Sequence, residues 1–67
     1  MITVNVNNQN HTFKEPVMLP ELLEDLGIQH TGIAVAIDDQ VISKANWATT
    51  LLENGNKVLV IRAAQGG

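Results

Sequence analysis

Hydrophobic and polar residues alternate at the start of the chain in the pattern of a half-buried strand. In residues 2–6, ITVNV, the apolar side chains share one parity and the polar ones the other. Residues 7–10 are all Asn or Gln and favour a turn, after which residues 11–14 predict a short partner strand. The chain is therefore expected to begin with a β-hairpin.

The spacing of apolar residues becomes helical in residues 19–27. The leucines of this segment recur at i, i+3, i+4 and i+7 and form one stripe, while acidic residues occupy the other face. Pro20 falls in the first turn, where its missing N–H costs little, and Gly27 suits the position just after a helix. Met18 is a poor N-cap. A short amphipathic helix is predicted.

A second apolar run, residues 32–38, has Ile and Val on one parity and only alanines on the other. It predicts a strand with large side chains on its core face and small ones on its second face. Asp38 and Asp39 are expected to form a turn before a short return strand, residues 40–42.

Residues 43–56 show no clear period and predict an irregular connection, with one turn of helix near residues 45–47. The Asn54–Gly55 pair is a strong turn signal. Residues 57–64, KVLVIRAA, then predict a last strand.

One short helix covers only one face of such a sheet, which predicts an α+β domain whose other face meets water or a partner. In the last strand we expect Val58 and Val60 to face the helix. Leu59 and Ile61 then point to the uncovered face, beside the alanines of residues 32–38. An exposed apolar patch of this kind often marks a protein interface.

The chain has 67 residues, which predicts a single domain. It contains no cysteine, so disulfides and thiolate metal sites are excluded. The net charge is −3 and the basic residues are scattered, which argues against a nucleic-acid partner. No signal peptide or bilayer-length apolar stretch is apparent, and a cytoplasmic location is the simplest expectation.

No catalytic constellation is apparent in the sequence. We find no nucleophile–base pair and no glycine-rich nucleotide loop, so neither an enzyme nor a cofactor or metal site is predicted. Asp38 and Asp39 are interpreted as solvated turn residues, and His11 and His30 as exposed residues of a strand edge and a loop. Trp47 is expected to close the edge of the core.

The chain ends on Gln65, Gly66 and Gly67, which we expect to form a flexible tail on a domain of residues 1–64. A terminal carboxyl group has a pKa near ~3.3–3.7, so it is ionised at neutral pH and is a poor electrophile. It becomes reactive when another protein converts it to an acyl-adenylate. Glycines without Cβ atoms would let such a tail thread a narrow channel. From the residues alone, a carrier tail and a chance ending remain equally open.

Four features of the chain form one pattern. They are the ββαββ-loop-β order, the helix ELLEDLG (21–27), the segment from Val35 to Gly67 with its tryptophan and Asn–Gly turn, and the final Gly–Gly. This pattern resembles the β-grasp, ubiquitin-like sulfur carriers, and among them the ThiS family of thiamine biosynthesis. The likeness covers nearly the whole chain. The chain departs from the family's pattern where Ser43–Lys44 replaces a usual Pro–Arg or Pro–Lys, and where Met18 replaces a capping Ser or Thr.

The resemblance implies a β-grasp fold and a role as a protein carrier that is not itself an enzyme. A ThiF-type enzyme would use ATP to adenylate the carboxylate of Gly67. A cysteine desulfurase would supply sulfur to form a thiocarboxylate, and a ThiG-type thiazole synthase would accept it. Gly66 belongs to the tail, and Leu59, Ile61 and Arg62 are expected to contact partners. Arg62 is interpreted equally well as a solvated strand end.

Other interpretations remain open. A molybdopterin-type carrier shares the fold and tail, but such chains are usually longer, and the short chain with Trp47 favours thiamine. A ubiquitin-like modifier joined to lysines is a second alternative, and a binding domain with an inert tail is a third.

Overall fold

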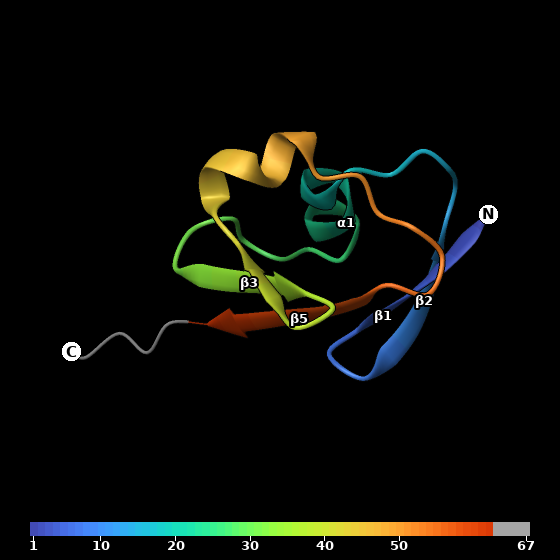
Figure 1. Cartoon of the computed structure of the whole chain (residues 1–67), viewed down its shortest axis with the longest axis horizontal. Helices are drawn as coiled ribbons and strands as arrows, with labels where there is room; N and C mark the ends of the chain where they lie inside the picture. Colours follow the sequence, from blue (N-terminus) through green and yellow to red (C-terminus); the bar gives the residue numbers. More distant parts are fainter. Residues whose placement is uncertain (63–67) are drawn as a thin grey trace.

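The protein folds into a five-stranded sheet with one α-helix and one 3-10 helix (Figure 1). The computed structural model describes residues 1–62, so residues 63–67 lie outside the description. The predicted order of strands and helix is confirmed. In chain order the elements are β1 (Ile2–Val6), β2 (Gln9–Phe13), α1 (Leu19–Asp25), β3 (Ile33–Ile37), β4 (Gln40–Ile42), η1 (Lys44–Thr49) and β5 (Lys57–Arg62).

The sheet is mixed, with the strand order β2-β1-β5-β3-β4. The two hairpins, β1–β2 and β3–β4, are antiparallel and lie on either side of β5. Strand β5 is parallel to β1 and antiparallel to β3. The last strand of the chain is therefore central, and the α+β, β-grasp prediction is confirmed.

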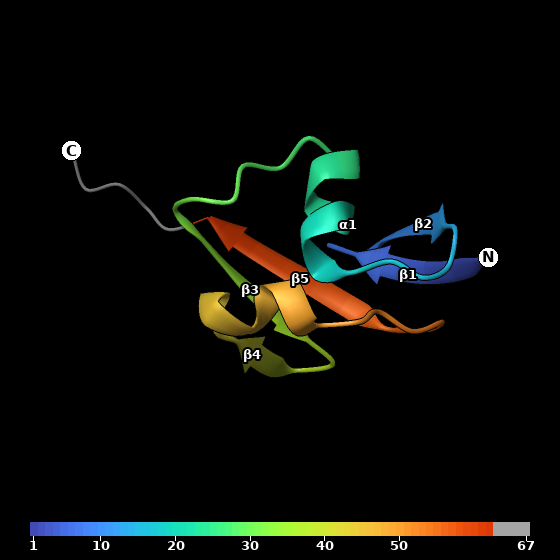
Figure 2. The same ribbon diagram turned by 90° about the horizontal axis from the view of Figure 1, so that it is seen from above.

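Both helices lie on the same face of the sheet, as the two perpendicular views show (Figures 1 and 2). The leucine stripe of α1 and the apolar parity of the strands meet between the two layers and form one core. The buried residues of this core are Ile2, Val4, Val6, Phe13, Val17, Leu19, Leu22, Leu23, Val35, Trp47, Leu52 and Val58.

Both hairpins turn on two residues with positive φ. Asn7 and Asn8 have φ of 49° and 69°, and Asp38 and Asp39 have the same two values. Two consecutive positive φ angles are the signature of a type I′ turn, which Asn and Asp tolerate well. The four-residue turn expected at residues 7–10 is therefore wrong. The turn needs only two residues, so β2 begins at Gln9.

Helix α1 starts where it was predicted to, although Met18 offers no conventional capping side chain. The carboxylate of Glu21 accepts the backbone N–H of Met18 at 3.1 Å, which is half of a capping box. Gly27 follows the helix with φ of 69°, in the left-handed conformation that its position requires.

The connection between β4 and β5 is more regular than expected. It contains the six-residue helix η1, which is longer than the single turn predicted near residues 45–47. Trp47 lies on this helix and is 4% exposed, so its predicted place at the core is confirmed. Its indole N–H donates to the carbonyl of Ile42 at 3.0 Å, which ties η1 to the end of β4. Within residues 1–62, no helix has the length and apolar character needed to cross a bilayer.

Candidate functional site

Strand β5 has one buried and one exposed row of side chains. Val58 is buried and Val60 is partly buried against the core, as predicted. Leu59 and Ile61 lie on the other face and are 45% and 52% exposed. Since alternate residues of a strand point to opposite faces, the predicted parity is confirmed.

The exposed row of β5 is part of a larger apolar surface. Leu59 pairs with Ala36, and Ile61 pairs with Ala34, so the leucine and isoleucine stand beside the smallest apolar side chains. Ala36 also pairs with Val41 of β4, which is 78% exposed. We call these five residues the open apolar face. Val41 was not predicted to belong to this surface, although its alternation with the partly buried Ile42 indicates it.

Polar side chains from both hairpin turns hold the backbone of β5. The carboxylate of Asp38 accepts the backbone N–H of Lys57 at 2.9 Å and the side-chain amide of Asn56 at 2.8 Å. The side-chain oxygen of Asn7 accepts the backbone N–H of Val60 at 2.8 Å. Asp38 is exposed, as expected for a turn residue. Its two hydrogen bonds also hold the start of β5 in place, and this role was not predicted.

Arg62 is the last described residue and ends β5 in register with Ile33. It is exposed and forms no ion pair within residues 1–62. The predicted tail residues Gln65, Gly66 and Gly67 lie outside the described residues. Leu59, Ile61 and Arg62 thus lie at the end of the strand that leads to the tail, but Arg62 has the parity of Val58 and Val60 and points to the opposite face from Leu59 and Ile61.

The two histidines are less exposed than predicted. His11 and His30 are both partly buried, and each lies beside an aromatic ring. The ring of His11 is 6.3 Å from that of Phe13, and the ring of His30 is 6.4 Å from that of Trp47 in an edge-on arrangement. The expectation that both histidines are exposed is therefore wrong, because each packs beside an aromatic ring of the core.

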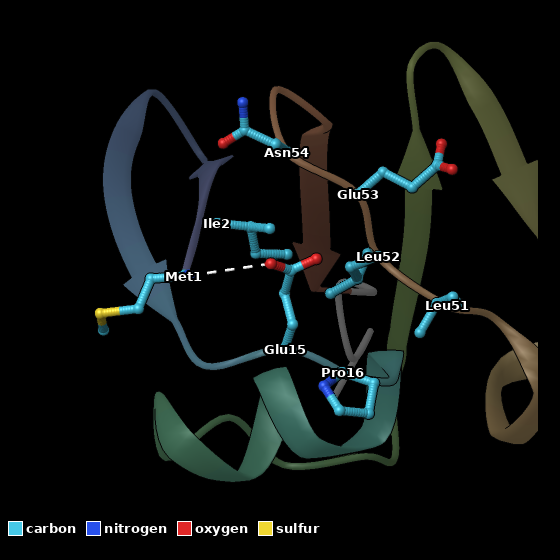
Figure 3. A pocket seen from close by; sticks show the side chains of 8 residues that line it. All are labelled: Met1, Ile2, Glu15, Pro16, Leu51, Leu52, Glu53 and Asn54. Atoms are coloured by element: carbon cyan, nitrogen blue, oxygen red, sulfur yellow. Dashed lines mark ion pairs between the residues drawn. The ribbon is translucent and has the colours of Figure 1, made fainter.

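An open depression of about 640 Å³ lies near the start of β1 (Figure 3). The start of β1 and the end of β5 lie on opposite sides of the molecule (Figure 1). The amino group of Met1 lies 3.7 Å from the carboxylate of Glu15, an ion pair that is drawn as a dashed line in Figure 3. None of the predicted site residues among residues 1–62 lines this depression. Among residues 1–62, no group of three or more His, Asp or Glu side chains is placed to hold a metal ion. The depression is lined by Met1, Ile2, Glu15, Pro16, Leu51, Leu52, Glu53 and Asn54.

Comparison with known proteins points to one family. The model of the ThiS family matches residues 3–67. The sulfur carrier protein ThiS of Escherichia coli K12 is 34% identical over 47 residues, which cover 70% of this chain and 71% of that protein.

Solved structures give the same fold. The crystal structure of the thiamine biosynthesis protein ThiS from Geobacter metallireducens superposes with a TM-score of 0.85 at 22% identity, covering 98% of this chain and all of that one. A solution NMR structure of a thiamine biosynthesis protein from the same organism gives a TM-score of 0.76 at 22% identity, covering 98% of this chain and 88% of that one.

Proposed function

Since this chain belongs to the ThiS family, we propose that it carries sulfur for thiamine biosynthesis on the carboxylate of its last residue, Gly67. The chain is a carrier and not itself a catalyst. One observation supports this role above the others. The strand that leads to the two glycines is central in the sheet and displays the open apolar face just before them.

The proposed chemistry takes place in partner proteins. In a ThiF-type enzyme, a carboxylate oxygen of Gly67 bonds to the α-phosphorus of ATP and pyrophosphate leaves. A cysteine-desulfurase persulfide then attacks the acyl carbon and AMP leaves. A thiol cleaves the sulfur–sulfur bond, is itself oxidised to a disulfide, and leaves a thiocarboxylate on Gly67. A ThiG-type thiazole synthase accepts that sulfur, and all of these steps would take place in the cytoplasm.

The two parts of the chain would divide this work. Residues 1–64 form the domain that partners bind, and Gln65 with the two glycines forms the arm that enters an active site. Docking uses Leu59 and Ile61, whose exposed side chains offer apolar surface without rearrangement of the core. Arg62, exposed at the end of the same strand, adds a positive charge where the arm begins.

Intact mass measurement tests this proposal. The protein is incubated with a ThiF-type enzyme, ATP, a cysteine desulfurase and cysteine, and a thiol reductant. We expect a mass gain equal to the replacement of one oxygen by sulfur, located at the C-terminus by fragmentation. A variant that lacks Gly67 should stay folded and gain nothing.

The same experiment separates the rival functions. If the wild type gains no mass where a ThiS protein of known activity does, the proposal is wrong. A covalent conjugate with a lysine would indicate a ubiquitin-like modifier instead. A thiocarboxylate that molybdopterin synthase consumes, and thiazole synthase does not, would indicate the molybdopterin pathway.

A further inference from the structure

Asn7 occupies an unusual place between β1 and β5. The parallel pairing of these strands is short and joins Asn5 to Lys57 and Val6 to Val58. The chain then leaves the sheet in the type I′ turn, at Asn7 itself. Beyond Val58, therefore, β1 no longer runs beside β5.

The side chain of Asn7 continues the ladder after the backbone has turned away. Its backbone N–H donates to the carbonyl of Val58 at 3.0 Å, as the next residue of a parallel strand would. In a continuing strand, the backbone carbonyl of residue 7 would then accept the N–H of Val60. Instead, the side-chain oxygen of Asn7 accepts it, at 2.8 Å. One residue thus makes both bonds.

This bond holds the part of β5 that matters for the carrier. Val60 lies between Leu59 and Ile61, the two exposed residues of the open apolar face on this strand. On the other edge, β3 pairs with β5 as far as Arg62. Within residues 1–62, the bond from Asn7 is the only described hydrogen bond between the first hairpin and β5 after Val58.

We propose that Asn7 is a positioning residue for sulfur transfer, because it fixes the direction in which the end of β5 leaves the sheet and so presents the open apolar face and the tail to partners. The inference rests on the carrier function proposed above. Without this bond, the end of β5 is paired on one edge only. A partner would then have to order it on binding, and binding would weaken.

The turn offers a matched set of variants. Asn7→Gly removes the acceptor but keeps a residue that tolerates φ of 49°. Asn7→Asp restores an acceptor oxygen at the same place. Asn8→Gly makes the same change one residue later, where φ is 69° and the side chain forms no described hydrogen bond. This last variant controls for the effect of an added glycine in the turn.

Two measurements test the inference. Amide exchange at Val60 should become about fivefold faster in Asn7→Gly, and this readout does not depend on the biological role. With a ThiF-type enzyme, the KM for the carrier in ATP–pyrophosphate exchange should rise about fivefold, or about 1 kcal/mol, with kcat unchanged. Asn7→Asp should restore both values, and Asn8→Gly should leave both at the wild-type level.

Each other outcome overturns the inference in a recognisable way. If Asn7→Gly exchanges faster at Val60 but keeps the wild-type KM, the bond does not affect presentation. If core amides such as that of Val4 lose protection together with Val60, the bond supports the whole fold rather than the end of β5. If the wild type itself supports no exchange of pyrophosphate, the proposed function fails, which is a different result.

Discussion

Replacement of Leu59 by alanine should weaken partner binding while leaving the fold intact. The side chain lies within the open apolar face, paired with Ala36, and is 45% exposed. Burying a whole leucine side chain is worth about 1.5–3 kcal/mol. A partner that covers the exposed 45% therefore gains about 1 kcal/mol from this residue, which corresponds to about fivefold in Kd.

Ile61 contributes in the same way, since its 52% exposed side chain lies two residues further along the same face. The double variant Leu59→Ala, Ile61→Ala should weaken binding by about 2 kcal/mol, or about 30-fold. The free energy of unfolding should fall by about 1 kcal/mol per site, because the fold already covers about half of each side chain, which is too little to unfold the protein at a single site. Isothermal titration calorimetry against a ThiF-type enzyme measures the first quantity, and urea unfolding measures the second.

Leu51 provides the matched control. It is 53% exposed, but it lies outside the sheet, beside the depression near the start of β1 (Figure 3). Leu51→Ala removes a side chain of the same size and similar exposure and should leave Kd unchanged. If Leu59→Ala binds as tightly as Leu51→Ala and the wild type, the open apolar face is not the docking surface.

Three further predictions concern the fold. Leu23→Ala should destabilise the protein by about 2–5 kcal/mol, because this fully buried side chain leaves a cavity. This loss is a large part of the ~3–5 kcal/mol that so small a core supplies, so thermal denaturation should show a strongly lowered melting temperature. Trp47→Phe should cost about 1–3 kcal/mol in urea unfolding, because the carbonyl of Ile42 loses its donor. Asp38→Gly should lower the melting temperature more than Asp39→Gly, because only Asp38 accepts described hydrogen bonds from the start of β5. Each kcal/mol of lost stability should lower the melting temperature by about 4–8 °C, and equal shifts in the two variants would contradict this reasoning.

The secondary structure and the burial of side chains were predicted correctly where the spacing of apolar residues matches the face that the fold buries. The leucine spacing predicted α1, and the alternation in β5 predicted both the buried Val58 and the exposed Leu59 and Ile61. In these segments each residue's environment depends on its own strand or helix and on one opposing layer. The order of the strands in the sheet was not predicted, and the central position of β5 is known from the structure.

The errors have two sources. Residues 43–56 carry no helical period, so the extent of η1 was not predicted, although the indole of Trp47 bonds the carbonyl of Ile42 only five residues away. The other errors arise where side chains from distant segments meet. The partial burial of His30 follows from the position of the same indole. Asn7 has the composition of an ordinary turn residue, and its bond to Val60 spans 53 residues. Such contacts require the fold to be known first.

The uncovered face of the sheet is divided, and this division explains where a partner would bind. On the β1–β2 side, polar residues satisfy each other, as where the amide of Asn5 donates to Asn10 at 3.1 Å. On the side of β5, β3 and β4, the same face carries Lys57 at the start of β5 and beyond it only alanines and exposed Leu, Ile and Val. Desolvation is costly for the first half and favourable for the second. A partner therefore gains most by covering the half that borders the end of β5, which brings its active site to the tail.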